Sequence, residues 1–249
     1  MNKMKTQSIF CGLFSIAFFY ICWGISQFLS IEMQYPLLSS LLFSILFTGI
    51  IGSFIPIYFK NSFRWSYNAP SSNRILGYGF LLLAIIFSTL LSGALSKVVE
   101  LNYSWILILK YILLFFPMSL GIGLFAFLLI PNLIQGWKND KKRSALLVIS
   151  IGLFFFLAFY VDSLFQDIAL AGTMGLIGLL LGLGYIFLRN FWVVYSALFI
   201  IMLVNTLADN KYNDYSFWIV IVSTLLSLTI LALDYIWNRK RKYLNLAIE

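Results

Sequence analysis

The chain has 249 residues, of which 61% are hydrophobic and 10% charged, with a formal net charge of +8. A soluble domain of this length cannot bury so much apolar surface, so the composition excludes an ordinary water-soluble globular protein. The apolar runs continue for roughly 17–25 residues without alternation, which predicts helices that span a bilayer rather than the strands of a barrel.

The sequence predicts one all-α integral membrane domain over residues 1–249, built from a bundle of eight transmembrane helices. Lys3 and Lys5 precede the first apolar stretch, which continues without a clear cleavage site and is interpreted as a retained span. Tryptophan and tyrosine residues mark several span ends, as is typical of membrane interfaces. The predicted spans are 8–29, 36–58, 75–95, 105–131, 144–161, 168–188, 191–208 and 217–237.

The basic residues fall on alternate connections between these spans. On one side the connections hold only Lys97 and Lys211. The positive-inside rule therefore predicts a multi-pass protein with both termini on the cytoplasmic side, most simply in a bacterial cytoplasmic membrane. The remaining basic residues outside the spans, fourteen in number, all lie in segments 1–7, 59–74, 132–143, 189–190 and 238–249.

This distribution explains the positive charge without a nucleic-acid partner. The charge follows the membrane sides, and the basic tail is expected to contact anionic lipid headgroups. The tail residues that carry this expectation are Arg239, Lys240, Arg241 and Lys242.

The chain contains no histidine, so the commonest general base and metal ligand is missing. We assign no catalytic residue, cofactor or metal ligand from the sequence. Two ionisable residues lie inside predicted spans, and both are close to an interface. Lys110 lies about 7 Å into its span by helical rise and is expected to reach back to the outer surface. Asp234 is expected to pair with the basic tail.

Three glycines, Gly175, Gly178 and Gly182, share one face of the predicted span 168–188. Small residues on one face let a neighbouring helix approach closely, which favours a packing role. The alternative is that this face lines a cavity.

Polar residues inside the spans are few. The prolines and glycines of span 105–131 predict that it is kinked or ends early, and its inner end leads to Asn132 and Gln135. These two side chains are candidate binding residues. Asn205, near the outer end of its span, is expected to form a hydrogen bond between helices.

The order of features over about 175–207 resembles a known family. The Gly-rich helix from Gly178, then Tyr185, Arg189 and a helix led by Trp192 that reaches Asn205, are similar to the CAAX protease and bacteriocin-processing (CPBP) family. The resemblance implies an eight-span helical membrane protein.

The hydrolytic motifs of that family are a Glu-Glu pair followed by Arg, a Phe-x-x-x-His and a His-x-x-x-Asn. The corresponding segments here are Ile130–Gln135, which has no carboxylate, Phe156–Tyr160, with tyrosine in place of histidine, and Ile201–Asn205, with only the asparagine kept. The resemblance therefore implies a member without the family's proteolytic groups.

Three functions remain open from the sequence. The first is a non-catalytic scaffold, regulator or immunity factor that binds another membrane or surface protein. The second is a permease or translocator subunit, with a cavity between the Gly face, Asn132 and Gln135. The third is a structural subunit of a larger membrane complex.

Overall fold

The computed structural model describes residues 73–91, 104–134 and 140–209, together with scattered positions between 16 and 28 and positions 225 and 229. Nearly all of these described residues are helical, and none of them lies in a strand. This confirms the all-α class for the described part of the chain. The predicted span 36–58, nearly all of 217–237, and Gln135, Asp234 and the tail from Arg239 to Lys242 lie outside the described residues.

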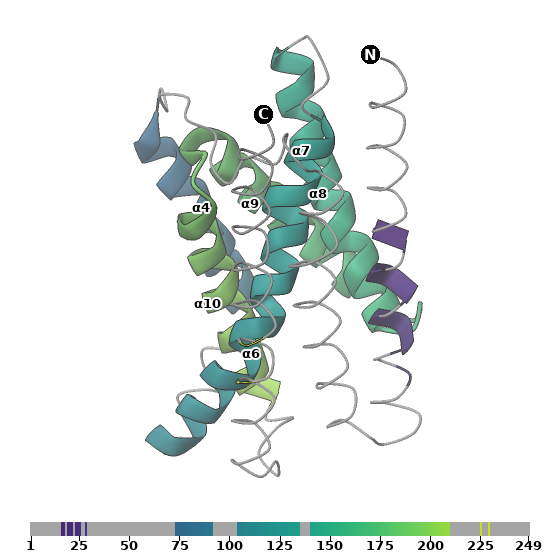
Figure 1. The fold of residues 1–249 in the computed structure, drawn as a ribbon, viewed down its shortest axis with the longest axis vertical. Coiled ribbons are helices and arrows are strands. Elements are labelled where there is room, and N and C mark those ends of the chain that lie inside the picture. The colour runs from purple at the N-terminus through teal and green to yellow at the C-terminus, as the bar shows by residue number, and fades with distance from the viewer. Residues whose placement is uncertain are drawn as a thin grey trace, which may run out of the picture.

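The described helices run side by side along the long axis of the molecule (Figure 1). Three of them, α8, α9 and α10, are long and apolar enough to cross a membrane, and α4 is a shorter apolar helix. A helix of about 20 residues is about 30 Å long, which matches the hydrocarbon core of a bilayer. The helices are α4 (Arg74–Leu91), α6 (Trp105–Leu124), α7 (Ile130–Ile134), α8 (Asp140–Asp162), α9 (Ile168–Leu188) and α10 (Phe191–Asp209), and the π-helical turn η2 (Phe125–Leu129) joins α6 to α7.

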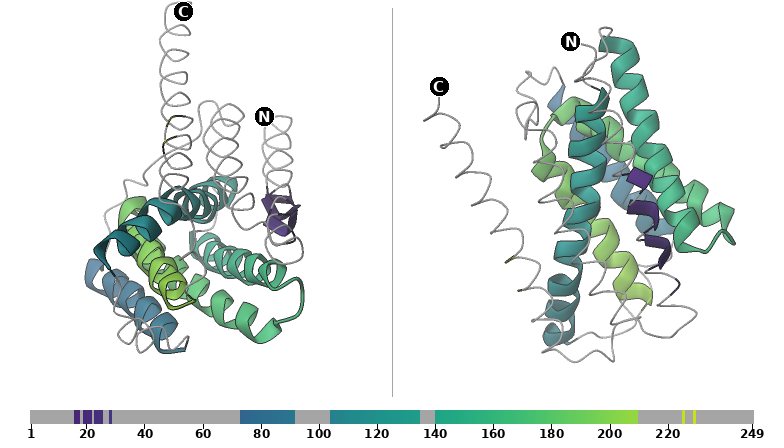
Figure 2. Two further views of the ribbon diagram at one scale, coloured as in Figure 1. Left: turned by 90° about the horizontal axis from the view of Figure 1, so that it is seen from below. Right: turned by 45° about the vertical axis from the view of Figure 1, so that its right-hand side comes forward.

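The helices form a closed ring when the bundle is seen along its axis (Figure 2, left). Helix α9 packs against α8 on one side and against α4 on the other, and the α8–α9 contact is the most extensive among the described helices. Helix α10 packs against both α4 and α6, and α7 and η2 contact α8 and so complete the ring. Residues far apart in the sequence, such as those of α4 and α9, are therefore neighbours.

Aromatic side chains fill the interior where η2 and α8 meet helical residues of the predicted span 8–29. Phe19 is packed between Phe125 and Phe154, with ring centroids 4.7 and 5.0 Å away. The rings of Phe125 and Phe154 are nearly parallel, at 4°. The Tyr20 hydroxyl donates a 2.8 Å hydrogen bond to the Phe154 carbonyl. This contact attaches the first predicted span to α8.

Of the two alternatives expected for the long helix that begins at Trp105, a kink or an early end, the structure excludes the early end. The helix neither ends at Pro117 nor stops at Pro131, but continues through η2 to Ile134. In the π-helical turn the Ile130 N–H donates to the Phe125 carbonyl, five residues back. A proline ring crowds the carbonyl four residues before it, and a widened turn just ahead of Pro131 relieves that conflict without ending the helix.

Candidate functional site

The three glycines of α9 lie at the α8 contact. A methyl group added to Gly178 would lie 2.8 Å from Phe155 Cδ2, and one added to Gly175 would lie 3.1 Å from Phe156 Cβ. A methyl group on Gly182 would lie 3.3 Å from the backbone Cα of Val148. This face of α9 is thus filled by α8 and does not border a cavity, which matches the packing interpretation and not the cavity alternative.

Tyr160 takes part in the motif that ends α8. Leu164 adopts a left-handed conformation (φ 50°). The Phe165 N–H donates to the Tyr160 carbonyl at 2.8 Å, and the Leu164 N–H donates to the Val161 carbonyl at 3.0 Å. The Tyr160 and Phe165 rings meet edge to face at 5.2 Å. These are the two hydrogen bonds and the apolar contact of a Schellman motif, so Tyr160 closes a helix end.

Asn205 connects α10 to α4, as predicted for an interhelical hydrogen bond. Its Nδ2 donates to Ser88 Oγ and to the Ile201 carbonyl, both at 2.8 Å. Its Oδ1 is buried and accepts no hydrogen bond. Ile201, which the resemblance aligns with a histidine, is 3% exposed and packs in the core. Both positions therefore have structural contacts.

A second polar link, between α6 and α10, was not anticipated from the sequence. The Ser119 and Tyr195 hydroxyls lie 3.1 Å apart, and the Tyr195 hydroxyl also donates to the Phe116 carbonyl at 3.3 Å. The Tyr195 ring stacks on Phe191 with an interplanar angle of 7°. Only the spatial pairing of α6 and α10 reveals this link, since the two hydroxyls are 76 positions apart.

Lys110 corrects an expectation. The sequence predicts that its side chain reaches back to the outer surface, but Lys110 is only 6% exposed, and the adjacent Tyr111 is 0% exposed. Its side chain is engaged in an interaction. The rise along a helix gives the depth of a residue but not its direction. The low exposure of Lys110 and Tyr111 shows that this part of α6 points into the protein.

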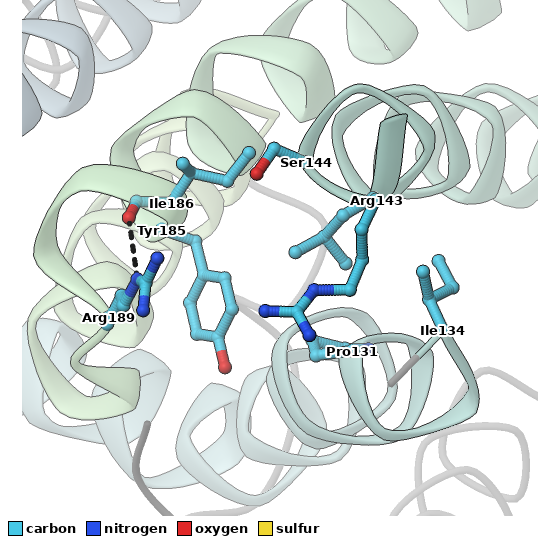
Figure 3. A pocket seen from close by; sticks show the side chains of 8 residues that line it. Pro131, Ile134, Arg143, Ser144, Tyr185, Ile186 and Arg189 are labelled. Atoms are coloured by element: carbon cyan, nitrogen blue, oxygen red, sulfur yellow. Dashed lines mark hydrogen bonds between the residues drawn. The ribbon is translucent and has the colours of Figure 1, made fainter. Parts of the chain in front are cut away.

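A small pocket of about 40 Å³ lies at the end of the bundle where α7 ends, α8 begins and α9 ends. Arg143 and Ser144 enter it from α8, and Tyr185 and Arg189 enter it from α9. Pro131 and Ile134 of α7 provide an apolar wall. Figure 3 shows the Arg143 guanidinium reaching toward the Tyr185 ring from one side, with the Arg189 guanidinium on the other side.

Arg189 is held by an unusual backbone. It is the residue after the last turn of α9 and has a left-handed conformation (φ 48°), with its N–H donating to the Tyr185 carbonyl at 2.7 Å. Glycine is the usual residue at this position because a Cβ is disfavoured there. The Arg189 Nε donates to the Ile186 carbonyl at 3.4 Å. The next residue, Asn190, caps α10 by accepting from the Trp192 N–H at 3.0 Å.

The structure brings few of the predicted candidates together. Asn132 lies in α7 beside the pocket-lining Pro131, but only its backbone is described. Tyr160, Lys110 and Asn205 lie toward the other end of the bundle. Among the described residues no three acidic or cysteine side chains gather where they could hold a metal ion. In the sequence, Arg143 and Arg189 indicate only the orientation of the spans in the membrane.

Neither a protein-family model, nor a curated protein, nor a solved structure matches this chain.

Proposed function

We propose that this chain is a polytopic membrane protein with eight spans and both termini in the cytoplasm, and that it acts by binding rather than by catalysis. In this proposal it is a CPBP-like protein without the proteolytic groups, and it serves as a scaffold, regulator or immunity factor for a membrane or surface protein. The α8–α9 connection then lies outside the cell, and the Arg143–Arg189 pocket lies at the cytoplasmic face.

One observation carries the binding proposal: positions that the resemblance aligns with hydrolytic groups are occupied by side chains with structural contacts. Tyr160 belongs to the end motif of α8. Ile201 is packed in the core, and Asn205 joins α10 to Ser88 of α4. A side chain committed to holding helices together is poorly suited to activating water, which requires a base that can reach the substrate.

The translocator alternative has less support, because the Gly face that it would use as a cavity wall is in contact with α8. In the structural-subunit alternative the chain also binds other proteins, but its partners are the components of a large membrane complex. A native gel distinguishes the two, since a subunit of a large assembly migrates at high mass with cofactor-bearing proteins.

Purification of the tagged protein from its own membranes, after crosslinking in the intact membrane, tests the proposal. We expect one defined partner in constant ratio to the protein. Tyr160→Phe should retain that partner, because the ring contact with Phe165 does not use the hydroxyl. Gly178→Leu, which disrupts the α8–α9 contact, should lose it. A protein that purifies alone and forms no crosslink in its native membrane would contradict the proposal.

A further inference from the structure

The α8–α9 connection, residues 163–167, satisfies its own backbone hydrogen bonds. Each N–H group of these residues donates to an acceptor in the connection itself or in the last turn of α8. The acceptors are the carbonyl oxygens of Phe159, Tyr160, Val161 and Ser163 and the Ser163 hydroxyl oxygen. A loop in water does not require such pairing, because water bonds its free N–H groups, whereas lipid offers few partners. This backbone is therefore suited to surroundings in which water is scarce.

The polar side chains of the connection serve the same backbone. The Ser163 hydroxyl donates to the Tyr160 carbonyl at 3.1 Å and accepts from the Asp167 N–H at 3.2 Å. The Asp167 carboxylate accepts from the Leu170 N–H at 2.8 Å and so caps α9. Ser163 and Asp167 thus hold the turn in shape, and Gln166 between them is exposed.

Two apolar side chains in and beside the connection are turned outward. Phe165 is 62% exposed, and Ile168, the first residue of α9, is 66% exposed. Leu164 and Phe165 both have left-handed backbone conformations (φ 50° and 66°), which are strained for residues other than glycine. The strained turn therefore places an aromatic ring at the surface. Hydrogen-bonding groups turned inward and apolar groups turned outward are the reverse of what a loop in water requires.

The exposed apolar surface continues from the connection along both helices. Its further members are Leu170 and Leu176 of α9 and Leu157, Leu153 and Ile149 of α8. Both helices are long and apolar enough to cross a membrane, and in a membrane this surface faces lipid. Because the connection is short and folded into turns, Phe165 and Ile168 stay close to the helix ends. At that level a bilayer has the boundary between its headgroups and its acyl chains.

We propose that the α8–α9 connection is seated in this interfacial layer of the bilayer, with Phe165 and Ile168 inserted among the lipids. The partner is an uncharged lipid surface, since aromatic and aliphatic side chains at a span end favour that layer and Asp167 does not attract anionic headgroups. The inference rests on the part of the proposed function that places α8 and α9 across the membrane. It does not depend on a protein partner.

Spin-label accessibility in phosphatidylcholine vesicles is the test. After Cys11 and Cys22 are replaced by serine, Ile168→Cys carries a nitroxide, whose collisions with oxygen and with a water-soluble nickel chelate are compared. Oxygen concentrates in lipid, so we expect collisions with oxygen to be severalfold more frequent than collisions with the chelate. More frequent collisions with the chelate would overturn the proposal, and would leave a protein in the aqueous phase as the occupant of the patch.

Two asparagine substitutions in the Ile168→Cys protein make the result specific. Phe165→Asn should raise the collision frequency with the chelate severalfold, because it removes the aromatic anchor. Asparagine adopts the left-handed conformation more readily than phenylalanine, so this change cannot be attributed to a disturbed turn. Gln166→Asn is the matched control at the adjacent exposed position and should leave the collision frequencies unchanged. Equal frequencies in the Phe165→Asn protein and the control would overturn the proposal.

A second label position separates this inference from the proposed membrane topology. Leu153 is exposed in the middle of α8, and a nitroxide on Leu153→Cys should collide mainly with oxygen. Access of the chelate to Ile168→Cys alone overturns the interfacial seat of the connection. Access to both positions shows in addition that α8 does not cross the membrane. The measurements use purified protein and lipid, so they are independent of partner capture in native membranes.

Discussion

Gly178→Leu is expected to lower the free energy of unfolding by about 3 kcal/mol or more. Even a methyl group at this position would lie 2.8 Å from Cδ2 and 2.9 Å from Cβ of Phe155. The Cβ atom cannot move without its helix, so α8 and α9 must separate. In lipid, helix association depends on close packing because lipid tails are as apolar as the side chains, so this separation is costly.

Gly172→Leu is the matched control in the same helix. A methyl group at Gly172 would meet nothing within 4 Å, and leucine is a better helix former than glycine. We expect this variant to be as stable as the parent or slightly more stable. Reversible unfolding by sodium dodecyl sulfate in mixed micelles, followed by circular dichroism, measures both. Equal midpoints for the two variants would show that α8 and α9 are not in close contact.

Tyr195→Ala is expected to produce the second large loss, about 3 kcal/mol. Tyr195 is 5% exposed, stacks on Phe191, and lies at the contact of α10 with α6. Removing the ring leaves a cavity and forfeits the packing on Phe191. It also removes the hydroxyl that contacts Ser119.

Tyr195→Phe separates these contributions. It keeps the ring and removes only the hydroxyl, so it should cost about 0.5–1 kcal/mol, the usual size of an interhelical hydrogen bond in a membrane protein. The same unfolding measurement applies. If the alanine and phenylalanine variants lose equal stability, the hydroxyl rather than the ring is the main contributor, and the packing argument for α10 is wrong.

Much of the fold could be predicted from the sequence because bilayer physics constrains it strongly. Backbone groups in lipid must be paired within a helix or a closed barrel, and long continuous apolar runs favour helices. Helices α9 and α10 cover the predicted ranges 168–188 and 191–208 almost residue for residue. The two polar residues between these helices, Arg189 and Asn190, mark the boundary where α9 ends and α10 begins. Asn190 is the N-cap of α10.

The direction of each side chain around its helix could not be predicted in the same way. The packing faces have low amphipathicity, since lipid-facing and buried residues are both apolar. The burial of Lys110 is an example, because its position along the helix does not indicate that its side chain points into the protein. The π-helical turn before Pro131 could not be predicted either. A proline indicates that the regular hydrogen bonds of the helix are interrupted, but not whether the helix ends there or continues through a wider turn.

The candidate site illustrates the same limit. Arg143 and Arg189 are 46 positions apart, and in a sequence each is explained adequately by the positive-inside rule. Their convergence on Tyr185 follows from the close antiparallel packing of α8 and α9, which the glycines permit. The packing signal was visible in the sequence, but its consequence for the two arginines required the register of the helices.

The central claim is that α8 crosses the membrane with its Arg143 end in the cytoplasm, and site-specific cysteine labelling tests it most directly. After Cys11 and Cys22 are replaced by serine, single cysteines are introduced at Lys142, which is exposed in the first turn of α8, and at Gln166, which is exposed in the connection between α8 and α9. A membrane-impermeant maleimide added to intact spheroplasts should label Gln166→Cys at once and Lys142→Cys only after permeabilisation. Labelling of both from the same side, or in the reverse order, would contradict the account.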